Sequence, residues 1–212
     1  MEKHTIVDAI VNKKIIAIIR IKDSKNILKI TEALLNGRIN IIEVSFNNPH
    51  AIDCIEKISK EFKEEVIIGA GTVLDESNAI NAINSGARFI VSPIFDNETV
   101  ATCSRYGIVS IPGVLTPNEA MEAYSSGADF VKIFPAGSLG PSYLKAILSP
   151  LPQLRIVAVG GVDLNNAKDF LKNGAAALAI GSSLVSNNAI SSGNFEMIKK
   201  NAEDLLISIK GV

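Results

Sequence analysis

The chain has 212 residues, 47% of them hydrophobic and 20% charged, and its formal net charge at pH 7 is -1. A chain of this size and apolar content can bury one substantial core, so the sequence predicts a single domain over residues 1–212. Neither sign of charge is concentrated in a tail or a stripe, which excludes the basic surface of a nucleic-acid-binding protein.

The N-terminal segment MEKHTIVDAIVNKK is too polar for a signal peptide, and no apolar run in the chain approaches the length of a membrane span. The sequence therefore predicts a cytoplasmic protein with no membrane partner. Within this segment, residues 5–13 predict a short helix.

Apolar runs typical of β-strands then recur along the chain. They cover residues 15–20, 41–45, 66–70, 89–92, 108–112, 130–134, 156–159 and 177–180. Amphipathic stretches of helical period lie between them, among them residues 24–36, 50–63, 76–85, 98–106 and 118–125. Residues 194–209 predict a last outer helix. Strand and helix therefore alternate along the chain.

This alternation predicts an α/β fold, and the eight strand-like runs predict a (β/α)8 TIM barrel, closed at its lower end by the helix of residues 5–13. With a repeat of roughly 20 to 27 residues, the predicted barrel is shorter than a typical barrel of ~250 residues. An open doubly wound sheet is the alternative, but that fold requires neither eight units nor polar residues after every strand. Several helices finish at a glycine suited to a left-handed C-cap, namely Gly37, Gly86, Gly107, Gly127 and Gly174.

Cysteine and histidine are too sparse to suggest a metal site. Cys54 and Cys103 are isolated from each other on predicted helices, where they suit core packing. His4 lies near the N-terminus and His50 in a loop, which gives little material for a histidine-based metal site or general base. We therefore expect no metal ion and no cofactor.

Three charged residues end otherwise apolar strands, at the edge of a barrel where functional residues gather. They are Arg20, Glu43 and Lys132. Burial of such a charge without a partner is costly, so these side chains must interact with one another or with a ligand. A structural ion network among the three is the alternative to a catalytic site.

Lys132 is the most unusual of the three, because it lies among Phe130, Val131, Ile133 and Phe134. Removal from water disfavours the ammonium form, so such a lysine either extends to solvent or has a lowered pKa. A neutral amine is a nucleophile. The simpler interpretation is a lysine whose ammonium group pairs with a carboxylate.

Glycines follow the last two strands, at the position where barrels often bind phosphate. Gly160 and Gly161 follow the seventh strand, and Gly181 and Ser182 follow the eighth. Glycine lets the backbone approach an anion closely, and residues 182–185 could open a short helix whose N-terminus attracts it. The sequence therefore predicts a phosphate site at these loops.

Six motifs occur in the order IIEVSFNNP, GAGTVL, SIPGVLTPNEA, VKIFPA, VAVGGV and IGSSL. Over about residues 15–185 they resemble the family of 2-keto-3-deoxy-6-phosphogluconate and 2-keto-3-deoxy-6-phosphogalactonate aldolases, class I enzymes on (β/α)8 barrels. The resemblance implies that Lys132 forms the Schiff base, Glu43 is the acid and base, and Thr72 contacts pyruvate. The family's phosphate-binding backbone falls on Gly160, Gly161, Gly181 and Ser182. The resemblance also implies a homotrimer.

The chain departs from the commoner family pattern in the loop after Glu43. Many members have an arginine there, in a pattern like EVTLRTP, that holds the substrate carboxylate, whereas this chain has Asn47. The galactonate branch is more similar, with an arginine at the end of the first strand, a Gly140-Pro141 pair and AVGGV in place of PTGGV. We expect Arg20 to bind the carboxylate. Because Val159 replaces a threonine hydroxyl, the galactonate-type C4 epimer should be used at least as well as the gluconate type.

Together these features predict a metal-free aldehyde-lyase that cleaves a 2-keto-3-deoxy-6-phospho sugar acid to pyruvate and glyceraldehyde 3-phosphate. The amine of Lys132 would form an imine with the ketone, and Glu43 would move the protons. A phosphosugar isomerase or synthase barrel, in which Lys132 is only a counter-ion, is one alternative. A non-catalytic barrel that binds small anions is another, and it would form no covalent adduct.

Overall fold

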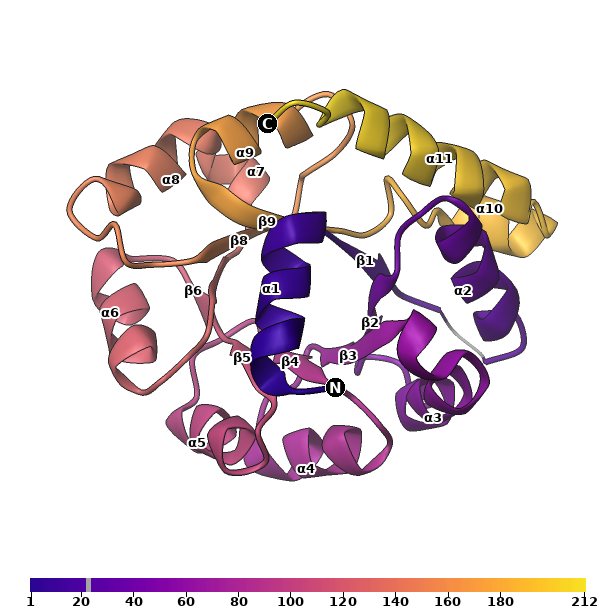
Figure 1. Cartoon of the computed structure of the whole chain (residues 1–212), viewed down its shortest axis with the longest axis horizontal. Helices are drawn as coiled ribbons and strands as arrows, with labels where there is room; N and C mark the ends of the chain where they lie inside the picture. The colour runs from indigo at the N-terminus through magenta and orange to yellow at the C-terminus, as the bar shows by residue number, and fades with distance from the viewer. Residues whose placement is uncertain (22–23) are drawn as a thin grey trace.

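A ring of short parallel strands forms the centre of this protein, in a computed structural model that describes residues 1–21 and 24–212 (Figure 1). Every strand residue except Ala176 is buried, as expected for a sheet with both faces covered. The strands are β1 (Ile15–Ile19), β2 (Ile41–Ser45), β3 (Ile67–Gly71), β4 (Phe89–Val91), β5 (Val109–Ile111), β6 (Gly113–Val114), β7 (Val131–Ile133), β8 (Ile156–Val159) and β9 (Ala175–Ile180). They pair in the order β5-β4-β3-β2-β1-β9-β8-β7-β6.

Pro112 divides one extended segment into β5 and β6, because proline has no N–H to donate to a neighbouring strand. β5 pairs with β4, and β6 pairs with β7. The N–H of Phe130 also donates to the Ser110 carbonyl, and that of Lys132 to the Pro112 carbonyl. The two ends of the strand order therefore meet at one segment. The predicted (β/α)8 barrel is confirmed, and the open doubly wound sheet is excluded.

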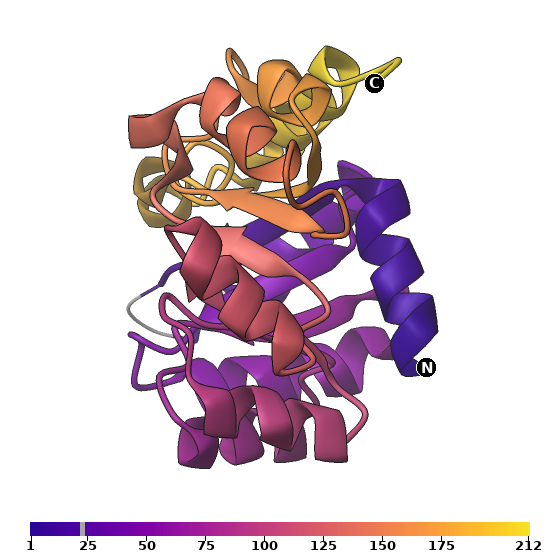
Figure 2. The same ribbon diagram turned by 90° about the vertical axis from the view of Figure 1, so that its left-hand side faces the viewer.

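Helices follow the strands and cover the outside of the barrel (Figure 2). The five amphipathic stretches named from the sequence form α2 to α6, with ends within three residues of those predicted. The helices are α1 (Lys3–Lys13), α2 (Ile27–Asn36), α3 (Ala51–Phe62), η1 (Lys63–Glu65), α4 (Glu76–Asn84), α5 (Asn97–Arg105), α6 (Pro117–Ser125), α7 (Ala136–Leu139), α8 (Pro141–Leu148), α9 (Ala167–Lys172), α10 (Asn187–Ser192) and α11 (Phe195–Ser208). None of those within the described residues has the length and apolar character needed to cross a membrane.

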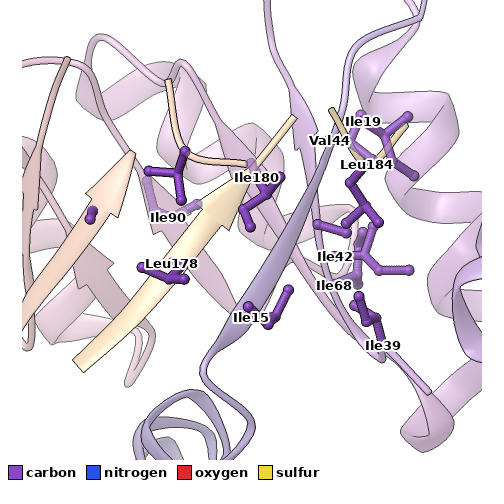
Figure 3. Close-up of a cluster of buried hydrophobic side chains, with 14 of the residues drawn as sticks. Ile15, Ile19, Ile39, Ile42, Val44, Ile68, Ile90, Leu178, Ile180 and Leu184 are labelled. Atoms are coloured by element: carbon purple, nitrogen blue, oxygen red, sulfur yellow. The ribbon is translucent and has the colours of Figure 1, made fainter. Parts of the chain in front are cut away.

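Alternating strand residues divide the apolar interior into two clusters. An outer core lies between the strands and the helices and includes Ile15, Ile42 and Ile68 (Figure 3). An inner core fills the barrel with residues such as Ile18 and Phe130. This alternation decides which side chains reach the inside of the barrel at its upper end.

The predicted N-terminal helix is confirmed as α1, which lies across one end of the barrel (Figure 1). Its buried side chains Ile6, Val7 and Ile10 belong to the inner core. The Nζ of Lys3 lies 3.0 Å from the Oδ2 of Asp129, just before β7, and this ion pair holds the start of α1 against the barrel. α1 therefore closes the end of the barrel opposite the predicted site.

Gly37 is the exception among the glycines predicted to end helices in the left-handed conformation. The other four have positive φ, but Gly37 has a φ of -82° and the left-handed residue is the next one, Arg38. A Cβ on Gly37 would lie 2.5 Å from the Cβ of Ala202 and 2.9 Å from the carbonyl oxygen of Lys199, both on α11. Gly37 therefore permits the close approach of α2 and α11.

We expect Gly37→Ala to lower the free energy of unfolding by about 1–3 kcal/mol, the usual cost of overpacking. The cost should shrink in the background of Ala202→Gly, because that change removes the atom nearest the new Cβ. Urea denaturation of the four proteins in this double-mutant cycle measures both values. An equal cost in both backgrounds would contradict the packing explanation.

Candidate active site

The three charged residues predicted at strand ends all face the inside of the barrel. Ile18 and Phe130 belong to the inner core. Arg20 follows Ile18 by two residues and Lys132 follows Phe130 by two residues, so both side chains face the same side as the inner core. Glu43 is the register partner of Ile18 in the adjacent strand and therefore also points inward. The structure thus gathers the charged side chains at the carboxyl ends of β1, β2 and β7.

Glu43 and Lys132 are buried, with exposed fractions of 2% and 6%. Burial raises the pKa of Glu43 above its ordinary value, although the positive charges of Lys132 and Arg20 act against this shift. Burial also lowers the pKa of Lys132, with Glu43 opposing and Arg20 adding to the effect. Both groups are therefore shifted toward their neutral forms, which favours a nucleophilic amine beside a proton-carrying carboxyl group.

Gly71 makes room for the Glu43 carboxyl group. A Cβ on Gly71 would lie 1.7 Å from the Oε1 of Glu43, so no other residue type could occupy this position without moving the carboxyl group. The other oxygen, Oε2, is buried and has no hydrogen-bond partner among the described residues. Sequence reasoning gave Gly71 no role, although a glycine at an inward-facing strand position signals that another group approaches it closely.

Thr72 follows β3 in a backbone conformation that is rare for a β-branched residue, with a φ of 60°. Its Oγ1 lies 2.7 Å from the Oγ of Ser45, which is fully buried at the end of β2. This hydrogen bond fixes the Thr72 hydroxyl beside the site. Sequence reasoning missed Ser45, whose signal is a hydroxyl at the next inward position after Glu43.

Phe134 lies close to both Lys132 and the loop after β8. The centroid of its ring is 5.0 Å from the Lys132 Nζ, which is within the range of a cation–π contact. A Cβ on Gly160 would lie 2.9 Å from the same ring. The ring therefore packs near both groups and contributes to the removal of the Lys132 amine from water.

A cavity of about 250 Å³ lies between the loops after β8 and β9. The glycines and serine predicted to bind phosphate all line it, namely Gly160, Gly161, Gly181 and Ser182. Arg20 lines it too, with its Nη1 2.9 Å from the position that a Cβ of Gly181 would occupy. Asp163 adds one carboxylate to the wall. Arg20 therefore lies with the predicted phosphate loops.

The prediction of a short helix opening at residues 182–185 is wrong, because these residues form only a single turn. The N–H groups of Leu184 and Val185 donate to the Gly181 carbonyl, at 2.9 and 2.8 Å, and the next helix, α10, begins at Asn187. None of the hydrogen bonds in the described part of the chain uses the N–H of Ser182 or Ser183. These two donors remain available to an anion.

Residues 1–21 and 24–212 contain no group of three or more histidine, cysteine or acidic side chains that could hold a metal ion. Cys54 and Cys103 are both buried in the outer core, as the sequence predicted. Burial raises the pKa of Cys103 to about 12, so its thiol is protonated at neutral pH.

This fold and site define a class of protein, a barrel with a buried lysine amine, a neighbouring buried carboxyl group and a glycine-lined cavity at the carboxyl ends of its strands. The family model described as KDPG and KHG aldolase matches residues 6–201. The chain belongs to this aldolase family.

Individual relatives agree with this assignment. A 2-dehydro-3-deoxy-phosphogluconate aldolase of Treponema pallidum is 32% identical, over 92% of each chain. A probable 2-dehydro-3-deoxy-6-phosphogalactonate aldolase of Rhizobium meliloti is 36% identical, over 81% of this chain and 82% of its own. The crystal structure of the KDPG aldolase of Legionella pneumophila, with pyruvate captured as a covalent carbinolamine, superimposes with a TM-score of 0.86 at 32% identity, covering 91% of this chain and 93% of its own.

The two neighbouring charges should move the pKa of Lys132 in opposite directions. Glu43→Gln removes the charge that raises this pKa, so the pKa should fall, whereas Arg20→Met removes a charge that lowers it, so the pKa should rise. Only a neutral amine is acetylated, so the midpoint of the acetylation rate at Lys132 against pH, read by peptide mass spectrometry, reports the pKa. Shifts of the same sign in both variants would contradict this electrostatic description.

Proposed function

We propose that Lys132 of this aldolase is the Schiff-base residue in the cleavage of a 2-keto-3-deoxy-6-phospho sugar acid to pyruvate and glyceraldehyde 3-phosphate. The observation that carries the proposal is a lysine of lowered pKa, 6% exposed, at the carboxyl ends of the barrel strands beside the buried carboxyl group of Glu43. Membership of the KDPG and KHG aldolase family supports the same chemistry. The aldolase is an aldehyde-lyase.

Lys132 supplies the electron sink. Its neutral Nζ attacks the C2 ketone, and loss of water from the carbinolamine leaves an iminium ion. The C4 hydroxyl then loses its proton, the C3–C4 bond breaks toward the iminium, and an aldehyde and an enamine result. Protonation of the enamine at C3 and hydrolysis of the imine release pyruvate and restore the amine.

Glu43 is our candidate for the proton transfers in this sequence. Its raised pKa lets the carboxyl group hold a proton closer to neutral pH than an ordinary glutamate does. Its Oε2 has no partner among the described side chains and is free to serve the substrate. The same group can assist carbinolamine dehydration, accept the C4 hydroxyl proton and return a proton to C3.

Thr72 is our candidate for contact with the pyruvate half of the substrate. Its hydroxyl is oriented by Ser45 at 2.7 Å and lies at the end of β3, next to the strand that carries Glu43. A hydroxyl held in this way can donate a hydrogen bond to a carboxylate oxygen without first losing rotational freedom.

Arg20 and the glycine loops form the proposed phosphate site. The sequence led us to expect Arg20 at the C1 carboxylate, but its guanidinium lies over Gly181 in the cavity lined by Gly160, Gly161 and Ser182. This position favours the phosphate end of the substrate. Arginine is always charged and offers several donors, which suits a phosphate group.

Val159 bears on the choice between the C4 epimers. It belongs to the inner core and therefore faces the inside of the barrel at the end of β8. Its side chain cannot hydrogen-bond a substrate hydroxyl, so Val159 does not stabilise the binding of one C4 epimer over the other through a hydrogen bond. We propose that the galactonate-type epimer is used at least as well as the gluconate type, which comparison of kcat/KM for the two epimers tests.

We also propose that the enzyme is a cytoplasmic homotrimer, as the family resemblance implies. Sedimentation at about three times the 22.5 kDa of one chain would support this assembly, and a monomer would contradict it.

Borohydride reduction in the presence of pyruvate is expected to attach a three-carbon adduct to Lys132, because the reagent reduces the imine to a stable secondary amine. Lys132→Met should lose both the adduct and turnover, whereas Lys145→Met, which changes an exposed lysine of α8, should keep both. Peptide mapping locates the adduct. Its absence, or its presence only on another lysine, would favour the isomerase or the non-catalytic anion-binding barrel.

Arg20→Ala is expected to raise KM for the phosphorylated substrate by about 10- to 100-fold, since hydrogen bonds to charged groups contribute ~1.5–3 kcal/mol. Trapping of pyruvate on Lys132 should continue, because pyruvate has no phosphate. Arg155→Ala, an exposed arginine just before β8, is the matched control. An equal loss of pyruvate trapping in Arg20→Ala would instead assign Arg20 to the carboxylate.

A further inference from the structure

In the loop after β8, the carbonyl groups of Gly160 and Gly161 are both hydrogen-bonded within the protein. The Gly160 carbonyl accepts the N–H of Gly137 in α7, at 2.7 Å. In a trans peptide the C=O and the following N–H point in opposite directions, so the N–H of Gly161 points away from α7. None of the hydrogen bonds among the described residues uses this N–H.

Asn166 binds the next peptide of the same loop. Its Nδ2 donates to the Gly161 carbonyl at 2.8 Å, and its Oδ1 accepts the N–H of Asp163 at 2.9 Å. The Gly161 carbonyl is therefore turned toward Asn166, and the N–H of Val162 points the opposite way. That N–H also lacks a partner within residues 1–21 and 24–212. Gly161 and Val162 both line the cavity of the proposed phosphate site.

Asn166 uses its side chain to bind the preceding loop and not to cap its own helix. It is the N-cap residue of α9, where an asparagine side chain commonly accepts an N–H from the first turn of its own helix. Here the side chain makes no such bond. Both ends of the amide are instead used by the loop that precedes the helix.

The second loop is tied to the first. The Oγ of Ser183 donates to the Val162 carbonyl at 3.1 Å, which joins the turn after β9 to the loop after β8. The Gly181 carbonyl is bound within its own turn, so the N–H of Ser182 is directed away from that turn. Four backbone donors, those of Gly161, Val162, Ser182 and Ser183, thus remain at the edge of one cavity.

We propose that Asn166 is a positioning residue for phosphate recognition, because it holds the Gly161–Val162 peptide with its N–H toward the anion. This proposal rests on the proposed phosphate site. Rotation of this peptide would replace a donor with a carbonyl oxygen, which repels phosphate. Without Asn166 the two glycines, with φ of 85° and 72°, would have no side chain to prevent that rotation.

Asn166→Asp tests the donor half of the amide. The carboxylate can still accept the Asp163 N–H but cannot donate to the Gly161 carbonyl. Asn165→Asp is the matched control, because it adds the same charge one residue away at a side chain with no hydrogen bond among those described. Asn166→Ala removes both bonds without adding charge.

The measurement is kcat/KM for the phosphorylated and unphosphorylated substrate with each protein, together with the shift in Tm that inorganic phosphate produces.

Asn166→Asp and Asn166→Ala are expected to lower kcat/KM for the phosphorylated substrate by roughly 10- to 100-fold, mainly through KM, and to leave the unphosphorylated substrate within about threefold. The stabilisation by inorganic phosphate should also be lost. Asn165→Asp should change the ratio between the substrates far less. A merely structural role would lower both substrates alike, so an unchanged ratio in both Asn166 variants would overturn the proposal. If the wild-type enzyme uses the two substrates equally, the phosphate site itself fails.

Discussion

The whole arrangement depends on the burial of an amine and a carboxyl group inside a barrel whose inner core is otherwise apolar. An isolated charge in such a place is costly, and burial shifts both Lys132 and Glu43 toward neutral forms. The apolar layer beneath them, with Phe130 and Ile18, stabilises the barrel and at the same time removes the amine from water. Stability of the fold and the lowered pKa of the lysine therefore have one physical origin. Arg20 adds to the effect on Lys132 without being buried itself.

The barrel could be predicted because its signals are local and repeated. Eight apolar runs and the amphipathic stretches between them each identify an element, and their number identifies the closure. What could not be predicted depends on partners distant in sequence. Gly37 follows a helix as a left-handed cap would, but its φ is -82°, and a glycine is needed there because the Ala202 side chain on α11 leaves no room for a Cβ. The segment interrupted at Pro112 likewise pairs with two different strands, β4 before the proline and β7 after it, and these partners cannot be identified from the segment itself.

The charged residues of the site could be predicted because each is an exception in its own strand. The residues that support them are not exceptions. Ser45 is an ordinary strand serine until the left-handed turn at Thr72 brings the two hydroxyl groups together. Asn166 is an ordinary N-cap until its side chain is seen to bind the preceding loop. Gly71 and Phe134 become significant only through the groups that lie against them. Such roles depend on three-dimensional register, which a pattern of residue types does not contain.

The helix that closes the lower end of the barrel, α1, also affects how reactants enter the site and how products leave it. Ile6 and Ile10 fill that end and Lys3 is paired with Asp129, so within the described residues the carboxyl ends of the strands are the open side for reactants and products. In the proposed reaction the pyruvate half is covalently attached to a side chain buried in that passage, while the phosphorylated half lies in the cavity by the loops. Because pyruvate leaves only after hydrolysis of the imine, the aldehyde departs first and pyruvate last, and α1 directs both products to the upper end of the barrel without contributing any chemistry.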